Sequence, residues 1–344
     1  MNKLRIIDST LRDGMHAVSH RFTPDDMAVI AAALAVAGLD TIEVGHGDGM
    51  GGSSYQYGFA AATDVEYLRA VKSVLTKTKL AVLLLPGIGT HRDLEKAAKY
   101  GADTVRIATH VTEADIAAQH VQIAKSLGME AICFLMMAHM APTAKVVEQA
   151  RLFDSYGADV VYVTDSAGAL LPHQVGERIA AVKEAVSVPV GFHAHNNLGL
   201  AVGNTLAAVA AGASSVDGCL CGLGAAAGNA QTEILAAVFD RMGIHTGIDL
   251  YKVMDAAEDV VQPRMHRPQI VGKLGLTTGW AGVYGSFMLH ATRAGDKYGI
   301  DPRDILVELG RLKTVGGQED LIIDVASRFA REAGDSGKHL LQRI

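Results

Sequence analysis

The chain has 344 residues, 49% of them apolar and 5% aromatic, and its 31 basic and 37 acidic residues give a formal net charge of -6. This balance argues against a surface that binds nucleic acid or an anionic membrane, and no apolar run is long enough to cross a bilayer. Three cysteines in a long chain without a secretory signal favour a reduced, cytoplasmic protein.

Short runs rich in Val and Ile alternate with longer Ala-rich stretches, which is the pattern of repeated βα units. Strands are expected at residues 4–8, 41–45, 80–85, 104–108, 131–136, 160–164, 190–195 and 215–220. Helices are expected at residues 24–37, 65–76, 92–100, 113–127, 145–156, 172–185, 201–210 and 233–242. Several helices are followed by a glycine and a short step into the next strand, at Gly38, Gly101, Gly157 and Gly212, which fits a repeated αβ turn.

Eight such units in about 240 residues predict an α/β fold, a (β/α)8 TIM barrel over residues 1–243. A doubly wound open sheet is the alternative, but no dinucleotide fingerprint follows the first strand. After residue 243 the strand pattern stops and Gly and Pro interrupt helical sequence. Residues 244–344 are therefore predicted to form a helical C-terminal extension.

In a barrel, catalytic residues gather where the strands end. The first strand leads into a loop with Arg12, Asp13 and His16, and the seventh ends in His193 and His195, which share one face of the strand. In a closed barrel Asp13 is the best-placed carboxylate to join the two imidazoles. Two nitrogens and one oxygen suit Mn²⁺, Mg²⁺, Co²⁺ or Zn²⁺ better than a soft ion, and the alternative is a pair of buried structural histidines.

Such an ion could chelate a 2-oxo acid and act as a Lewis acid. Arg12 could then stabilise a developing enolate, or only pair with Asp13. His16 is a candidate general base, or else an exposed loop histidine. No lysine ends a predicted strand, which argues against a Schiff-base aldolase. The glycine-rich segments GHGDGMGGSS and CGLGAAAGNA lack the Gly-Lys-Ser/Thr ending of a nucleotide-binding loop, although the second weakly resembles a dinucleotide turn.

Seven segments of the sequence resemble a known family. They are STLRDGMHAVSH, IEVGHGDGMGGSS, LLPGIGT, VTDSAGA, FHAHNNLGLAVGN, GLGAAAGNAQTE and GWAGVYGSF. The first and fifth are similar to the DRE-TIM metallolyase superfamily. All seven together resemble its 4-hydroxy-2-oxovalerate aldolase family, over residue 4 to about residue 320.

The resemblance implies a metal-dependent, class II pyruvate aldolase. It would cleave 4-hydroxy-2-oxovalerate to pyruvate and acetaldehyde, in the meta-cleavage catabolism of aromatic compounds or steroids. The metal would be Mn²⁺, with Co²⁺ or Mg²⁺ as alternatives. The implied metal ligands are Asp13, His193 and His195, with Arg12 stabilising the pyruvate enolate and His16 acting as base on the C4 hydroxyl. Tyr284 would close the site over C4, and Ser166 would contact the carboxylate or keto group. Leu83 and Leu85 would line the aldehyde pocket.

The resemblance also implies a partner, an acylating acetaldehyde dehydrogenase, in a complex with two copies of each subunit. The helical extension would be the docking surface, and Gly316-Gly317 would keep an aldehyde passage open or form an ordinary loop. Four alternatives stay open: a sister lyase that decarboxylates oxaloacetate, an acyl-CoA condensing enzyme, a non-haem Fe(II) oxygenase with the same ligand set, and a non-catalytic scaffold for the dehydrogenase.

Overall fold

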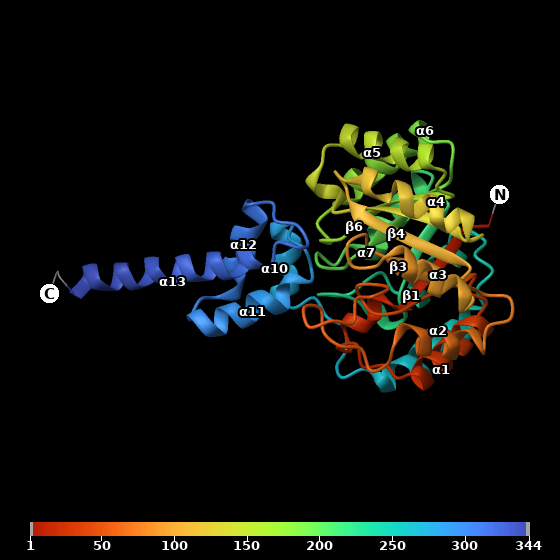
Figure 1. The fold of residues 1–344 in the computed structure, drawn as a ribbon, viewed down its shortest axis with the longest axis horizontal. Coiled ribbons are helices and arrows are strands. Elements are labelled where there is room, and N and C mark those ends of the chain that lie inside the picture. The colour runs from red at the N-terminus through yellow and green to blue at the C-terminus, as the bar shows by residue number, and fades with distance from the viewer. Residues whose placement is uncertain (1–2, 342–344) are drawn as a thin grey trace.

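The computed structural model describes residues 3–341, and its first two-thirds form one closed barrel of eight parallel strands paired in chain order (Figure 1). The strands are β1 (Arg5–Leu11), β2 (Thr41–Val44), β3 (Lys79–Leu84), β4 (Thr104–His110), β5 (Glu130–Met136), β6 (Val160–Asp165), β7 (Val190–Ala194) and β8 (Ser215–Gly218). The surrounding helices are α1 (Pro24–Val36), α2 (Asp64–Lys72), α3 (His91–Lys99), α4 (Ala118–Ser126), α5 (Thr143–Tyr156), α6 (Pro172–Ala185), α7 (Ala201–Ala210) and α8 (Thr232–Arg241). The predicted TIM barrel is confirmed.

Every expected strand and helix of the barrel is present, and most ends differ by one to three residues. Helix α2 ends at Lys72, earlier than expected, where the Ser73 hydroxyl donates to the Ala70 carbonyl at 2.7 Å. The stretch expected as one helix at 113–127 begins as the 3-10 turn η2 (Ala114–Ala117) before α4. Strand β1 runs three residues further than expected, so Arg12 and Asp13 follow it directly.

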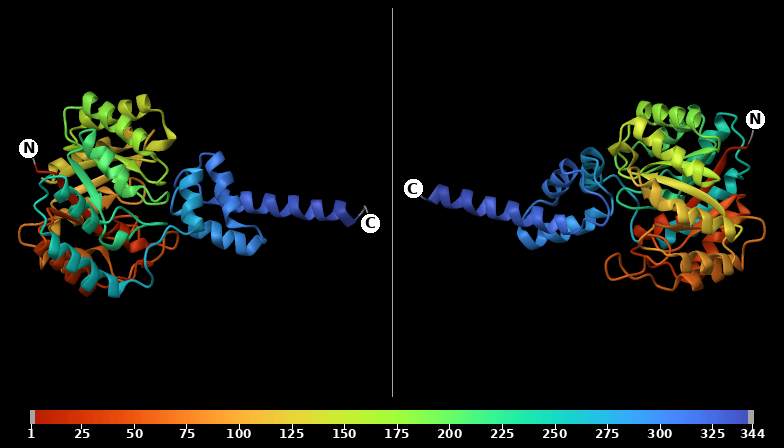
Figure 2. Two further views of the ribbon diagram at one scale, coloured as in Figure 1. Left: turned by 180° about the vertical axis from the view of Figure 1, so that it is seen from behind. Right: turned by 45° about the horizontal axis from the view of Figure 1, so that its top comes forward.

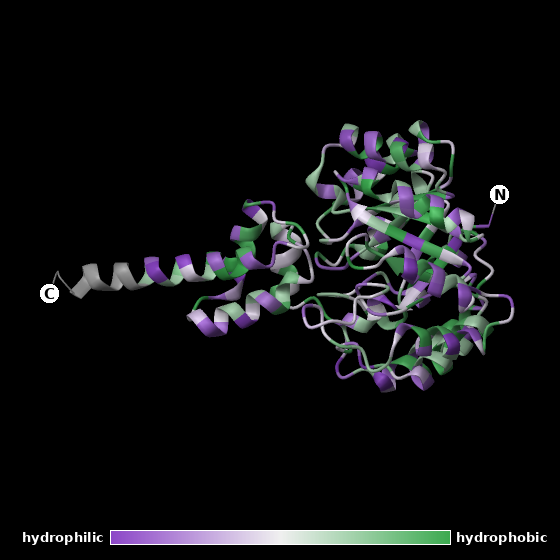
Figure 3. Ribbon diagram, in the orientation of Figure 1, coloured by the Kyte–Doolittle hydropathy of each residue, from purple (hydrophilic) through white to green (hydrophobic). Residues whose placement is uncertain are grey.

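Local sequence chemistry explains where the helices start and stop. Helices α1 and α2 begin at reciprocal capping boxes on Thr23 and Thr63, each worth about 1 kcal/mol. The predicted αβ turns are confirmed, because the four glycines noted above have φ values of +89° to +106°. That region costs glycine little and strains other residues. Apolar residues are frequent along the strands and in the surrounding helices (Figure 3), and buried apolar side chains form the core between sheet and helices.

The C-terminal helices divide into two groups. The first, α9 (Leu250–Asp255) with the π-helical turn η5 (Ala256–Val261) and the 3-10 turn η6 (Gln262–Arg264), packs beside α1 and α8 of the barrel. The second comprises α10 (Lys273–Ala281), α11 (Phe287–Tyr298), α12 (Pro302–Arg311) and α13 (Asp320–Leu341). It has its own apolar core, built on residues such as Phe287, Leu306 and Val325.

This second group, residues 273–341, stands beside the barrel in every view, and α13 points away from it (Figures 1 and 2). It approaches the loops that follow β7 and β8 through glycines of α10. A Cβ on Gly279 would lie 2.9 Å from Asn197 Cβ, and one on Gly275 would lie 3.1 Å from Ala227 Cβ. Among the described residues, no helix is long and apolar enough to cross a membrane.

Candidate active site

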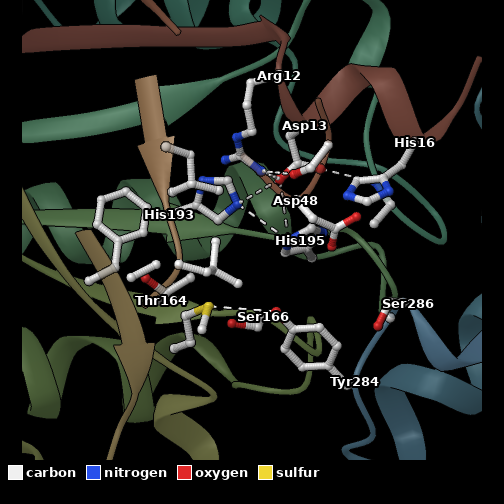
Figure 4. Close-up of a pocket in the computed structure, with 18 residues that line it drawn as sticks. Arg12, Asp13, His16, Asp48, Thr164, Ser166, His193, His195, Tyr284 and Ser286 are labelled. Atoms are coloured by element: carbon white, nitrogen blue, oxygen red, sulfur yellow. Dashed lines mark hydrogen bonds and ion pairs between the residues drawn. The ribbon is translucent and has the colours of Figure 1, made fainter. Parts of the chain in front are cut away.

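All nine site residues expected from the sequence line a single pocket at the C-terminal ends of the barrel strands (Figure 4). Eight come from the barrel, and Tyr284 comes from the segment between α10 and α11. The nine are Arg12, Asp13, His16, Leu83, Leu85, Ser166, His193, His195 and Tyr284. The structure therefore brings together residues that lie up to 272 positions apart in the sequence.

Asp13, His193 and His195 present their ligand atoms to one point. Asp13 Oδ2 lies 3.6 Å from His193 Nε2 and 3.8 Å from His195 Nε2, and the two nitrogens are 3.3 Å apart. Donors about 2.1 Å from a six-coordinate ion lie about 3 Å from each other at right angles. A small inward movement would therefore let all three bind one divalent cation, with further positions open. The residues fit a metal site.

A second carboxylate, that of Asp217, orients His193 as a candidate metal ligand. Asp217 Oδ2 accepts a 2.7 Å hydrogen bond from Nδ1, which leaves the Nε2 lone pair facing Asp13 and His195. This hydrogen bond fixes the ring and its tautomer, as is usual behind metal-binding histidines. Burial lowers the pKa of His195 to about 4, against the opposing effect of Asp13. The imidazole is therefore neutral near pH 7, as a ligand must be.

Arg12 is held in place by two acids. Its Nε donates to Glu43 Oε2 and its Nη1 to Asp13 Oδ2, each at 2.8 Å. Burial alone would raise the pKa of Asp13, but Arg12 and the neighbouring imidazoles hold it well below its usual range. The guanidinium thus lies against the Asp13 carboxylate with its orientation fixed.

Arg12 belongs to a buried ionic network of strand residues. Arg106 donates to Glu43 at 2.9 Å and pairs with Asp217, and its guanidinium lies 4.2 Å from the ring centroid of Phe134. Together with Arg12 and Asp13, the network has two guanidiniums and three carboxylates, which leaves one net negative charge. A divalent cation would reverse that sign, so the site would then attract a monoanionic acid.

Sequence reasoning missed Glu43, Arg106 and Asp217. Each is a charged residue in the middle of a predicted apolar strand, and all three side chains are buried. A buried charge needs a partner, and that signal could have flagged them.

Ser166 and Thr164 line the pocket wall opposite Arg12, and each carries a hydroxyl group. Ser166 Oγ accepts the Met137 backbone N–H at 3.0 Å, which leaves its proton free to donate to a ligand. Thr164 Oγ1 is buried and has no hydrogen-bond partner among the described residues. Both groups are suited to a bound carboxylate. Thr164 was not among the expected residues, although it lies within the quoted segment VTDSAGA.

Tyr284 enters the pocket from the C-terminal helices. Its hydroxyl lies 3.5 Å from Met136 Sδ, opposite Asp13, His193 and His195 (Figure 4). The turn that carries it is attached to the barrel by His139, whose Nε2 lies 2.9 Å from the Gly282 carbonyl and donates to it. The C-terminal unit therefore takes part in the pocket and does not merely cover it.

His16 lies at the pocket's mouth within a cluster of histidines. Its ring meets that of His20 edge to face, with the centroids 5.1 Å apart, and His20 stacks on His46 at 3.7 Å. Asp48, which also lines the pocket, lies 3.5 Å from His46. Of this group, the sequence predicts only His16 as a site residue.

The fold and the site together define a barrel enzyme with a candidate divalent-metal centre, whose residues are hydrogen-bonded to neighbouring acidic and basic side chains. An HMGL-like family model matches residues 3–260, and a model described as a DmpG-like communication domain matches residues 269–331. The carboxyl transferase domain of Rhizobium etli pyruvate carboxylase shares the fold, with a TM-score of 0.81 at 17% identity over 96% of this chain and 60% of that one.

Closer relatives narrow the class. The 4-hydroxy-2-oxovalerate aldolase of Carboxydothermus hydrogenoformans is 70% identical over 96% of this chain and 98% of its own length. That of Pelotomaculum thermopropionicum is 61% identical over 96% and 97%. The chain belongs to the 4-hydroxy-2-oxovalerate aldolase family, whose members are carbon–carbon lyases within the HMGL-like group.

Proposed function

We propose that this chain cleaves 4-hydroxy-2-oxovalerate to pyruvate and acetaldehyde, with Asp13, His193 and His195 holding Mn²⁺. The observation that carries the proposal is the convergence of those three ligand atoms beside Arg12 in a chain 70% identical to such an aldolase. Co²⁺ and Mg²⁺ suit the same donors. When bound, the ion supplies Lewis acidity that favours the enolate of a chelated 2-oxo acid.

Arg12 stabilises negative charge on the C2 oxygen as the C3–C4 bond breaks. Its two hydrogen-bonded acids fix the guanidinium before substrate arrives, so little reorganisation is needed in the transition state. The Ser166 hydroxyl donates to the substrate carboxylate at the opposite wall. These two contacts orient the C3–C4 bond toward the mouth of the pocket.

His16 accepts the C4 hydroxyl proton, which lets the electrons of the C3–C4 bond move toward C2. Tyr284 closes the C4 end, and Leu83 and Leu85 surround the aldehyde side chain. A proton from solvent then adds to C3 to give pyruvate, and His16 returns the C4 hydroxyl proton to solvent. The barrel, residues 1–243, thus carries the enolate chemistry, and residues 244–344 complete the site.

The aldehyde leaves toward an acylating dehydrogenase docked on the C-terminal helices. A second cavity supports this route, because it shares six lining residues with the active-site pocket and extends to Gly316 and Gly317. The shared residues are Asp48, Leu85, Ala108, Met136, Tyr284 and Ser286. The match to a communication domain over residues 269–331 supports the same partner. Two copies of each subunit, a cytoplasmic location and a role in aromatic or steroid catabolism remain predictions.

The test is a coupled assay on metal-stripped protein. 4-Hydroxy-2-oxovalerate is supplied with and without Mn²⁺, and pyruvate is read with lactate dehydrogenase. Pyruvate release that depends on Mn²⁺ is expected. Oxaloacetate decarboxylation without aldol cleavage would instead place the chain with a sister lyase.

Two variants test the assigned roles. His16→Ala should lose most of the cleavage activity but keep the exchange of pyruvate C3 protons with solvent, because that exchange does not use the C4 base. Arg12→Ala should lose both, because both pass through the enolate. Near-full cleavage by His16→Ala at neutral pH would refute the assignment of the base.

A further inference from the structure

A second set of potential metal ligands lies beside the first. His16, His20 and Asp48 offer two imidazoles and one carboxylate, with donor atoms all within 4.8 Å of one another. His16 and Asp48 line the active-site pocket, and His20 is buried. We propose that these three residues form a second divalent-cation site, suited to Zn²⁺, whose occupation withdraws His16 from catalysis.

The ring geometry supports a shared ion. The centroids of His16 and His20 are 5.1 Å apart with an angle of 71° between the rings. The corresponding values for His193 and His195, the imidazole pair of the first site, are 5.0 Å and 65°. Two imidazoles that bind one ion tetrahedrally at about 2.1 Å have centroids about 5 Å apart. The second pair therefore already has the spacing that a common ion requires.

The cluster combines one fixed ligand with two adjustable ones. His20 is held by stacking on His46 with an angle of 15° between the rings. Its Nδ1 accepts only a long, 3.4 Å hydrogen bond from the Gly47 N–H, and this bond is weak enough to give way to a metal. His16 and Asp48 are each half-buried at the pocket mouth. Both can close on an ion without disturbing the barrel core.

Both sites offer two imidazoles and one carboxylate, and such donors favour Zn²⁺ in each of them. Imidazole binds Zn²⁺ more tightly than Mn²⁺ or Mg²⁺, and two nitrogens with one carboxylate oxygen leave a fourth, open tetrahedral position. The surplus negative charge of the buried network lies beside the first site, so excess Mn²⁺ would fill that site before the second. Zn²⁺ would fill both.

The consequence for activity rests on the proposed function. A cation on His16 occupies the lone pair that would accept the C4 hydroxyl proton. Aldol cleavage would then stop. Exchange of pyruvate C3 protons would continue, because it needs only the first site and Arg12.

Counting bound ions tests the site directly. Metal-free protein is dialysed against Zn²⁺ and its zinc content is measured per chain. The wild-type chain should take two equivalents, while His20→Asn and His195→Asn should each take one. Asn suits position 20 because His20 has φ of +58°, a region that Asn tolerates. Asp48→Asn serves as a second variant, and melting followed by circular dichroism checks that each chain folds.

One equivalent in the wild type, or two in both His20→Asn and Asp48→Asn, would overturn the proposal. Absence of Mn²⁺-dependent cleavage alongside two zinc equivalents would instead refute only the proposed function.

A kinetic experiment tests the consequence in protein saturated with Mn²⁺. Micromolar Zn²⁺ should abolish cleavage while proton exchange and bound Mn²⁺ persist. Relative to its own zinc-free rate, His20→Asn should need at least about tenfold more Zn²⁺ for half-inhibition. The matched control is His173→Asn, an exposed histidine of α6, which should respond like the wild type. Parallel loss of cleavage, exchange and Mn²⁺ would mean displacement at the first site and would overturn the inhibitory role.

Discussion

Asp217→Asn isolates the effect of one charge behind the proposed metal site. Asp217 Oδ2 serves both His193 Nδ1 and Arg106, whereas Oδ1 is buried without a partner among the described residues. An asparagine would keep its oxygen toward those two donors and place its NH₂ where Oδ1 lies. The tautomer of His193 is then preserved, and only the negative charge is lost.

The size of the effect follows from the distance. Asp217 would lie about 7 Å from an ion on His193 Nε2, and at an effective dielectric of about 20 a unit charge there contributes about 5 kcal/mol toward a divalent cation. Relaxation of the network and solvent makes this an upper bound. Changes to such supporting residues usually weaken metal binding about 10- to 100-fold. We therefore expect the Mn²⁺ Kd of Asp217→Asn to rise within that range.

Electron paramagnetic resonance of free Mn²⁺ during titration of metal-free protein measures that Kd. The matched control is Asp165→Asn, because Asp165 is likewise a buried strand carboxylate but accepts the backbone N–H groups of Ala169 and Leu170. Its Kd should change less than about threefold. Equal effects of the two substitutions, or none from Asp217→Asn, would refute the reasoning.

Two further predictions concern the C-terminal unit and the stability of the fold. His139→Ala removes the hydrogen bond to the Gly282 carbonyl, so cleavage should fall about fivefold while pyruvate proton exchange stays unchanged. His139→Gln, which keeps a donor, should recover part of the loss, and an equal fall in exchange would contradict a role through Tyr284. Burial raises the pKa of Glu233 to about 7, so the folded state binds the extra proton and loses stability as pH rises from about 4.5 to 7. The free energy of unfolding of Glu233→Gln, relative to that of the wild type, should therefore increase by about 1 kcal/mol per pH unit across that window, allowing for partial exposure. Denaturant unfolding at pH 5 and at pH 8 measures this difference. If the carboxyl titrates normally, the difference between the two chains would be the same at both pH values.

The features predicted from the sequence are those set by local chemistry. Glycine at each αβ turn and alternating strand and helix patterns define eight repeats, and eight repeats can close a barrel in only a few ways. The pairing of His193 with His195 follows from the two-residue period of a strand. Asp13 joins them because β1 pairs with β8 once the barrel closes.

The features that escaped prediction depend on the register of the whole barrel. Glu43 meets Arg106, and Arg106 meets Asp217, across 63 and 111 positions of sequence. Nothing near any of the three indicates which partner it finds. The contact between His139 and Gly282 spans 143 positions and depends on how the C-terminal helices dock. Likewise, no local pattern reveals that His20 turns its ring toward His16.

The charge of the buried ionic network and that of the proposed metal ion are complementary. Two guanidiniums and three carboxylates are costly to remove from water, and replacing such groups with apolar residues often stabilises a fold. Here each charge supports another group: Asp217 orients His193, Glu43 holds Arg12, and Arg106 bridges the two acids. The surplus negative charge lies within reach of the Asp13, His193 and His195 atoms, and among the described residues no guanidinium or ammonium group other than Arg12 and Arg106 pairs with these carboxylates. A divalent cation would supply the missing positive charge. The residues whose burial disfavours folding are therefore the ones that would support the ion and position Arg12 for the enolate.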